Sequence, residues 1–258
     1  MRLLLFDLDG TLLTSEKTVS PGSLDAVGKA RKAGYLAGIV TSRSVRNSES
    51  FLASLSPDLL IASGGAIALY QGSVLFRHGF SGEETGEIIR KAREIVGPDA
   101  EITVDVDFAH FTNFRDKYDQ SKTTWGEDIY TAFDDWRDES LKVCVRIPEE
   151  EKARELIGLL PHCDAIRFSE EYWYKFTKAG VTKEDAVREA CSLLSVSLSD
   201  VTAFGDDLAD IGMLRMAGVG VAMGNALDEV KKAADRVIGG NDREGIRDYL
   251  EALLKEEA

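Results

Sequence analysis

Two carboxylates stand two residues apart where the first apolar run of the chain ends. The run 3–6 leads directly into Asp7, and Asp9 follows within the segment FDLDGT. An apolar run bounded by Gly10 is typical of a buried strand, and alternate side chains of an extended chain point to the same side. Two ionised carboxylates about 5 Å apart, at an effective dielectric constant of about 20, repel each other by about 3 kcal/mol. We therefore expect a cation or a proton at this site to offset the repulsion.

Further polar residues follow later apolar runs in the same way. They are Thr41, Ser42 and Arg43, then Ser63, Gly64 and Gly65, and finally Asp206 and Asp207, with Asp210 within one helical turn. Because ligand sites of open parallel sheets form beyond the carboxyl ends of the strands, we expect all of these residues to share one crevice with Asp7 and Asp9. Carboxylate oxygens at this density suit Mg²⁺, which keeps waters and phosphate oxygens in its coordination shell.

Each of these residues also has an ordinary structural interpretation. An aspartate after a strand more often forms a turn or caps a helix than binds a ligand, and Asp206 and Asp207 fit that description. Thr41 is likewise placed to cap the helix that follows it. Lys183 lies in the first turn of a predicted helix, where a basic residue opposes the helix dipole and is usually solvated. The joint pattern is therefore more informative than any single member.

The segments that must position these residues alternate between strand-like and helix-like character at both ends of the chain. This alternation predicts crossover units and a parallel sheet covered by helices on both faces. Two short runs about Gln71-Gly72 predict a hairpin. The middle of the chain instead suggests antiparallel pairs with helices on one face. We expect an α/β fold with a Rossmann-like core, residues 1–82 and 178–258, and an inserted smaller α+β domain, residues 83–177.

Composition excludes several classes of protein. The 258 residues carry a formal net charge of −14, and no cluster of basic residues stands out, so nucleic acid and anionic membranes are not expected partners. The apolar runs are too short for a membrane span or a secretory signal, so we expect a cytoplasmic protein. Three cysteines without CxxC spacing predict reduced thiols. The oligomeric state is not indicated, and any site for an anion must supply its own cations.

Taken in order, the motifs resemble the haloacid dehalogenase (HAD) superfamily. The segments DLDGTL, TSR, GVTKEDA and GDDLADIGML follow one another in the arrangement typical of that superfamily. The insertion between the second and third motifs, with Asn225-Ala226 and the late DREGI, is similar to its Cof-type phosphatases with a type IIB cap. The resemblance covers nearly the whole chain. It implies that residues 83–177 form a cap domain that selects the substrate.

The resemblance implies a Mg²⁺-dependent phosphatase that acts through an aspartyl-phosphate on a small phosphorylated metabolite, such as a sugar phosphate. Asp7 would attack phosphorus, and Asp9 would protonate the leaving oxygen and then deprotonate the attacking water. Asp9 must then carry a proton at the start of the reaction. The resemblance further implies that the metal is bound by Asp7, Asp206, Asp210 and the backbone carbonyl of Asp9, with Asp210 alternatively holding a metal-bound water. It implies phosphate binding by Thr41, Ser42 and Lys183. Accessory or substrate contacts are implied for Arg43, Gly64, Gly65, Asp207 and Asn225.

Three residues depart from the superfamily's pattern, since Ser42 stands where Gly is common and Gly64 and Ala209 stand where Asn is usual. Lys178 competes for the role of phosphate lysine, but the spacing after Gly180-Val181 favours Lys183.

Three alternatives remain at the level of sequence: a phosphomutase of the same fold, a phospho-ligand-binding protein without activity, and a receiver-like regulatory module. A receiver also uses an acidic cluster, a hydroxyl and a lysine on a parallel sheet. Asp9 argues against the receiver, because a receiver has no second aspartate two residues after the acceptor.

Overall fold

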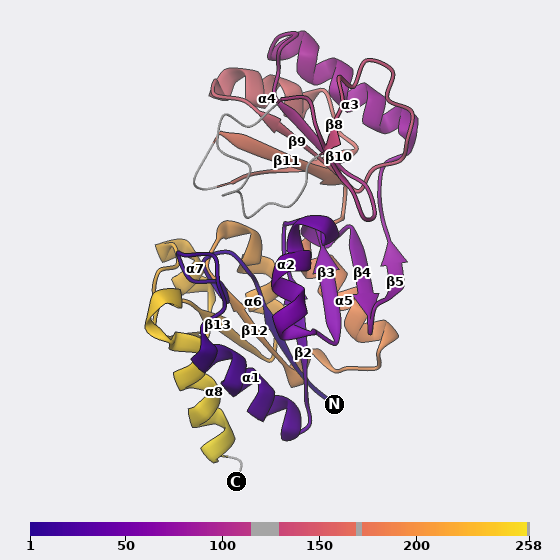
Figure 1. Ribbon diagram of the computed structural model, residues 1–258. Coiled ribbons are helices and arrows are strands. Elements are labelled where there is room, and N and C mark those ends of the chain that lie inside the picture. The colour runs from indigo at the N-terminus through magenta and orange to yellow at the C-terminus, as the bar shows by residue number, and fades with distance from the viewer. Residues whose placement is uncertain (115–128, 169–171, 257–258) are drawn as a thin grey trace.

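The computed structural model describes residues 1–114, 129–168 and 172–256, which form two β-sheets (Figure 1). The larger sheet has the strand order β14-β13-β12-β1-β2-β3-β4-β5. Its strands are β1 (Arg2–Phe6), β2 (Tyr35–Val40), β3 (Leu59–Ala62), β4 (Ile67–Tyr70), β5 (Ser73–Arg77), β12 (Val201–Gly205), β13 (Val219–Ala222) and β14 (Arg236–Val237). The pairs from β14 to β3 are parallel, whereas β4 and β5 are antiparallel and form the predicted hairpin. The carboxyl ends of the parallel strands therefore share one edge.

Helices cover both faces of this sheet. They are α1 (Pro21–Lys32), α2 (Val45–Leu55), α5 (Lys183–Leu193), α6 (Ile211–Met216), α7 (Asp228–Ala233) and α8 (Gly245–Glu256). Helix α1 packs on α8, and α5 packs on α6 (Figure 1). The two pairs cover opposite faces of the sheet, because right-handed crossovers on either side of β1 place their helices on opposite faces. Phe6 stacks on Phe204, which also meets Tyr249 of α8 edge-on. The predicted α/β class with a parallel-sheet core is thus confirmed.

The smaller sheet has the strand order β10-β11-β9-β6-β7-β8. Its strands are β6 (Ile102–Asp105), β7 (His110–Thr112), β8 (Ile129–Tyr130), β9 (Lys142–Arg146), β10 (Cys163–Arg167) and β11 (Trp173–Lys178), and its helices are α3 (Gly82–Ile95) and α4 (Glu150–Gly158). The chain enters this unit after β5 and leaves it through β11, and Figure 1 shows the unit beyond the carboxyl ends of the core strands. We propose this unit as the inserted domain.

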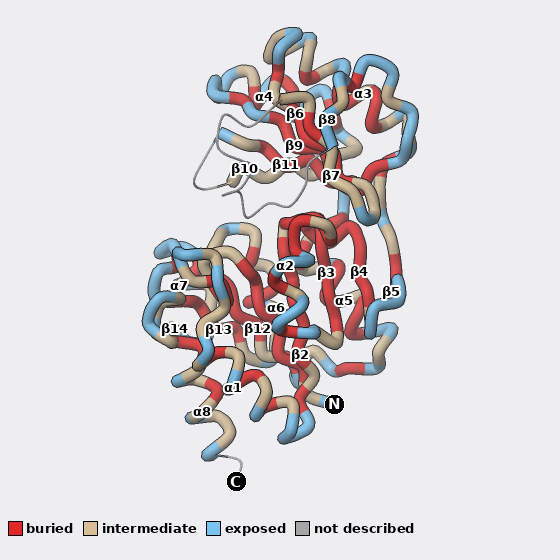
Figure 2. Tube along the Cα trace, viewed as in Figure 1, coloured by how far each residue is buried: buried red, intermediate tan, exposed pale blue. Residues whose placement is uncertain are grey.

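The two faces of the smaller sheet differ in character. Val104, Val143 and Phe176 are fully buried and belong to the apolar cluster that includes Ile88 of α3 and Leu156 of α4. In the pleated strands their neighbours point the other way, which turns a row of polar side chains away from the helices and toward the core. That row is Asp105 of β6, Lys142 of β9 and Lys175 of β11, all buried. Figure 2 shows buried segments along the inner strands of both sheets.

No helix among the described residues combines the length and the apolar character needed to cross a membrane.

Candidate active site

Three carboxylates meet at the carboxyl edge of the core sheet. Asp7 follows β1, and Asp206 and Asp210 follow β12, its parallel neighbour. One oxygen of each carboxylate lies within 4.8 Å of the other two, and Asp7 and Asp210 are buried. The register, in which Phe6 pairs with Phe204, brings the two strand ends level, so that residues distant in sequence become adjacent.

Lys183 joins two of these carboxylates. Its Nζ donates to Asp7 Oδ1 at 2.6 Å and to Asp210 Oδ1 at 2.6 Å. Burial would lower the pKa of Lys183, but the charges of Asp210 and Asp7 raise it above its ordinary value. Lys183 is therefore a cation inside the acidic cluster, whereas the competing Lys178 pairs with Glu84 at 3.3 Å.

The position of Lys183 follows from the start of α5. Thr182 caps the helix, since its Oγ1 accepts a hydrogen bond from the Asp185 amide at 3.1 Å. A Cβ on Gly65 would lie 2.3 Å from the Thr182 carbonyl oxygen, so only glycine allows the loop after β3 to approach this helix end so closely. Gly65 thus packs against Thr182, the residue before Lys183, and helps to position the start of α5.

Burial makes the carboxylates of Asp7 and Asp206 harder to ionise, and a bound cation would offset this cost. Burial raises the pKa of Asp206 to about 7; a hydrogen bond from Thr11 opposes the rise and the charge of Asp210 adds to it. Burial likewise raises the pKa of Asp7, with Lys183 opposing. Carboxylates brought together away from water suit a hard divalent ion, which replaces the missing solvation with oxygen coordination. The donor set of Asp7 and Asp206, with Asp210 beside them, therefore fits Mg²⁺.

Asp210 also holds the loop that carries Asp206. Its Oδ2 accepts hydrogen bonds from the amides of Asp206 at 3.0 Å and Asp207 at 3.1 Å. Both of its oxygens therefore have partners within the protein. The Asp207 side chain instead accepts from the Leu208 amide at 2.8 Å and caps the short turn that precedes α6.

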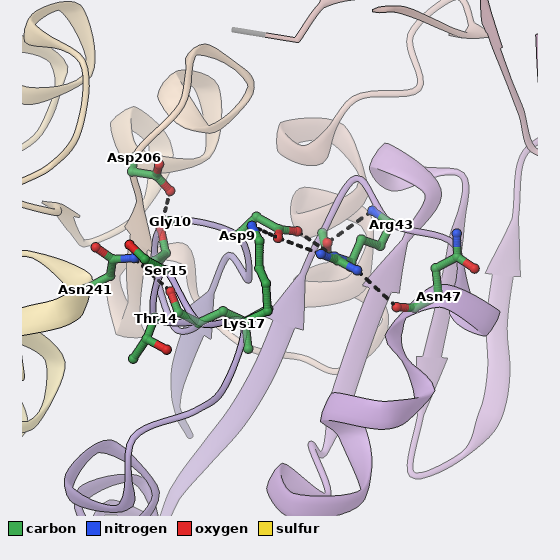
Figure 3. A network of polar contacts seen from close by, with 12 residues as sticks. Asp9, Gly10, Thr14, Ser15, Lys17, Arg43, Asn47, Asp206 and Asn241 are labelled. Atoms are coloured by element: carbon green, nitrogen blue, oxygen red, sulfur yellow. Dashed lines mark hydrogen bonds and ion pairs between the residues drawn. The ribbon is translucent and has the colours of Figure 1, made fainter. Parts of the chain in front are cut away.

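Asp9 lies apart from the acidic cluster, between two basic side chains (Figure 3). Arg43 donates from Nε to Asp9 Oδ2 at 2.6 Å and from Nη2 to Oδ1 at 2.7 Å, and Lys17 Nζ donates to Oδ1 at 2.8 Å. Burial would raise the pKa of Asp9, but Arg43 and then Lys17 lower it to about 2. In this arrangement the pairing with Arg43 and Lys17 keeps Asp9 ionised, whereas the role that the resemblance implies needs a proton on it at the start of the reaction.

Gly10 brings the turn after Asp9 against Asp206. Its φ is +79°, and a Cβ there would lie 2.2 Å from Asp206 Oδ2, so both conformation and space require glycine. Thr11 Oγ1 donates to Asp206 Oδ1 at 2.6 Å. Asn225 Nδ2 donates to the Gly10 carbonyl at 2.8 Å, while its Oδ1 accepts from the Asn241 amide at 3.0 Å. Asn225 thus positions the turn and is not part of the carboxylate cluster.

Thr41 and Ser42 follow β2 at the same edge. Thr41 is buried, and its Oγ1 accepts a hydrogen bond from the Arg43 amide at 3.1 Å. The Thr41 carbonyl accepts from the Gly64 amide at 3.0 Å, which ties the loop after β3 to the loop after β2. The Ser42 carbonyl accepts from Lys142 Nζ at 2.7 Å. The smaller sheet therefore touches the loop on which Thr41 and Ser42 lie.

A second contact between the sheets involves Asp105. Its Oδ2 accepts from Ser63 Oγ at 3.0 Å and pairs with Lys142 Nζ at 2.8 Å, while Oδ1 lies 2.5 Å from His110 Nδ1. Burial would raise the pKa of Asp105, but Lys142 and then His110 lower it to about 2. Asp105 and Lys142 thus form a buried ion pair at the junction of the two units.

The sequence interpretation assigned no role to Lys17, Lys142 or Lys175. A usable signal was present in YKFT at 174–177, where apolar and polar residues alternate, and in KVCVR at 142–146, where two valines alternate with Lys, Cys and Arg. This period of two indicates strands with one apolar and one polar face.

Comparison with known proteins gives matches over nearly the whole chain. Pyridoxal phosphate phosphatase YbhA of Escherichia coli K12 is 29% identical over 286 residues, covering 98% of each chain. The 5-amino-6-(5-phospho-D-ribitylamino)uracil phosphatase YbjI of the same organism is 28% identical over 276 residues, covering 100% of this chain and 98% of the relative. The solved structure of BT1666 from Bacteroides thetaiotaomicron, described as a phosphatase of the HAD superfamily, superimposes with a TM-score of 0.83 at 27% identity, covering 98% of this chain and 94% of that one.

The model of the haloacid dehalogenase-like hydrolase family matches residues 4–250. This range includes the acidic cluster, Lys183 and both sheets. The resemblance carried by the motifs is thereby confirmed, and with it the expectation of a hydrolase. The chain belongs to the haloacid dehalogenase-like hydrolases.

Proposed function

We propose that the protein is a Mg²⁺-dependent phosphomonoester hydrolase that acts through an aspartyl-phosphate on a small phosphorylated metabolite, such as a sugar phosphate. The observation that carries this proposal is the meeting of Asp7 with Lys183, Asp206 and Asp210 at the edge of the core sheet. It combines a carboxylate nucleophile, a buried cation and further carboxylates in one place. The phosphatases that resemble the chain act on pyridoxal phosphate and on a phosphorylated ribitylaminouracil, which supports a small phosphorylated substrate.

Asp7, Asp206 and the backbone carbonyl of Asp9 would hold the Mg²⁺. Asp210 would brace Lys183 and the Asp206 loop, or hold a metal-bound water, since both of its oxygens already accept hydrogen bonds. When bound, the ion would neutralise negative charge on the phosphoryl oxygens and on the carboxylates around them.

The side chains of the protein would carry the two displacements. In the first, an oxygen of Asp7 forms a bond to phosphorus while the ester bond breaks, and the leaving oxygen takes a proton from Asp9. In the second, Asp9 takes a proton from water, the water oxygen bonds to phosphorus, and the bond to Asp7 breaks. Lys183 and the Thr41 hydroxyl would hold the phosphoryl oxygens. Because the Thr41 oxygen accepts from the Arg43 amide, its own O–H is directed to another acceptor.

This role for Asp9 requires a change of partners. A protonated carboxyl cannot accept from Arg43 through both oxygens as it does here, so Asp9 must release at least one of these hydrogen bonds to carry a proton. We infer that substrate binding draws Asp9 away from Arg43 and Lys17.

The proposal is tested with Asp7→Asn, which keeps the volume of the side chain and removes its nucleophilic oxygen. We expect hydrolysis of p-nitrophenyl phosphate in Mg²⁺ to fall to background while the circular dichroism spectrum is unchanged. Turnover at the wild-type rate would refute the assignment of the nucleophile. The product separates hydrolysis from transfer: release of inorganic phosphate supports a phosphatase, and a phosphorylated acceptor would identify a mutase.

A further inference from the structure

Lys175 is a buried cation on the polar face of the smaller sheet. It lies on β11, opposite Cys144 of β9, and only 1% of its surface is exposed. Its neighbours Tyr174 and Phe176 belong to the apolar cluster on the other face, so the strand pleat directs Lys175 toward the core.

Lys175 differs from the other buried lysines of this region in having no anionic partner within residues 1–114, 129–168 and 172–256. Lys142 pairs with Asp105, and Lys183 pairs with Asp7 and Asp210. Lys175 forms no hydrogen bond or ion pair with any residue that the structure describes. Burial, together with the positive charges of Lys183 and Lys142, lowers its pKa to about 8, which still leaves most of it charged at neutral pH. A desolvated ammonium without a partner is unfavourable unless an anion is supplied from outside.

The amine of Lys175 lies against the loop after β3, which is hydrogen-bonded to the loop that carries the candidate phosphate-binding residue Thr41. A Cβ on Gly64 would be 2.6 Å from Lys175 Nζ and 3.1 Å from its Cδ. The Gly64 amide in turn donates to the Thr41 carbonyl at 3.0 Å. The absence of a side chain at position 64 therefore leaves the space that Nζ occupies, directly beside the carboxyl edge of the core sheet.

We propose that Lys175 is a specificity-determining residue that binds a second anionic group of the substrate, a carboxylate or a second phosphate on its leaving portion. The inference rests on the proposed phosphatase function. Thr41 and Lys183 reach the transferred phosphoryl group from the core, whereas Lys175 reaches the same edge from the opposite sheet, where the remainder of the substrate lies. Since the chain has a net charge of −14, such a group needs a local cation. Phosphomonoesters with a second negative charge are therefore the preferred substrate class.

Matched substrates test this preference. We compare 3-phosphoglycerate with glycerol 3-phosphate, which differ in a carboxylate, and fructose 1,6-bisphosphate with fructose 6-phosphate, which differ in a phosphate. The wild type is expected to have the higher kcat/KM for the more anionic member of at least one pair, and the pair identifies the anion. In Lys175→Met the ratio within that pair falls about 10- to 100-fold, the range for a hydrogen bond to a charged group. Lys178→Met, on the same strand but with a side chain that is 44% exposed and paired with Glu84, leaves the ratio unchanged.

Two readouts separate this role from a structural one. Because Lys175→Met removes a buried charge that no described residue pairs with, the melting temperature is expected to stay the same or rise. A lower melting temperature with an equal loss for both members of each pair would overturn the inference. Calorimetric binding of both pairs to Asp7→Asn repeats the comparison without turnover, and equal affinities there would also overturn it. Failure of the wild type to hydrolyse p-nitrophenyl phosphate would instead refute the proposed function.

Discussion

Arg43 holds Asp9 through both carboxylate oxygens, from Nε to Oδ2 at 2.6 Å and from Nη2 to Oδ1 at 2.7 Å. This pairing is the main reason that the pKa of Asp9 falls to about 2 despite burial. In Arg43→Gln we expect the pKa of Asp9 to rise toward its ordinary value, measured by titrating its carboxyl carbon by NMR. Lys17→Gln removes one hydrogen bond and is expected to give a smaller rise. An unchanged titration in folded Arg43→Gln would contradict the role of this pair.

Removing Lys183 should destabilise the protein strongly. Lys183→Met leaves Asp7 and Asp210 buried without their cation, and breaking a buried ion pair on one side costs about 3–5 kcal/mol in the free energy of unfolding. Urea denaturation in the absence of metal measures this loss, and added Mg²⁺ should recover part of it. The surface pair of Lys178 and Glu84 supplies the control, since Lys178→Met should change stability by less than about 1 kcal/mol.

The junction between the two sheets depends on Asp105. Asp105→Asn keeps the shape of the side chain but leaves Lys142 as an uncompensated buried cation, so we expect a loss of about 3–5 kcal/mol. Hydrogen exchange at the loops containing Ser42 and Ser63 should speed up. Asp107→Asn breaks a more exposed pair with Arg77 and is expected to cost at most about 1 kcal/mol. Equal effects of the two substitutions would show that burial of the Asp105 pair has no energetic consequence.

The metal-free protein should lose stability as the pH rises. The pKa of Asp206 is about 7 in the fold, against an ordinary value of 3.8 for an aspartate. Between these values the folded state binds more protons than the unfolded chain, so stability decreases with pH. With a chelator present, the melting temperature should be lower at about pH 8 than at about pH 5. Mg²⁺ should raise it more at the higher pH, because binding requires deprotonated carboxylates. Asp206→Asn should flatten the metal-free profile, and a metal-free profile that is already flat in the wild type would contradict this account.

The core and its acidic cluster could be predicted because their signals are local. Apolar runs ending at Asp7 and Asp206 mark strand ends, and parallel strands bring such ends to a common edge. The environment of Asp9 could not be predicted from spacing alone. The two-residue step suggested a shared side with Asp7, but β1 ends at Phe6, and Arg43 and Lys17 then determine where the Asp9 carboxylate lies.

The contribution of the smaller sheet was harder to predict for a different reason. Lys142 contacts the Ser42 carbonyl across 100 positions of sequence, and Asp105 contacts Ser63 across 42. No local sequence pattern predicts which face of the smaller sheet contacts which loop of the larger sheet. The alternation in β9 and β11 indicates that a polar face exists, but its partner becomes apparent only in three dimensions.

The polar face of the smaller sheet has a consequence for substrate exchange. Where Lys142 and Asp105 meet the loops of Ser42 and Ser63, the contacts are hydrogen bonds and an ion pair. If the two units separate there, water can replace these partners, and the apolar cluster beneath α3 and α4 stays covered. Separation of the two units at this junction would therefore expose little apolar surface, and a small exposed apolar area limits aggregation.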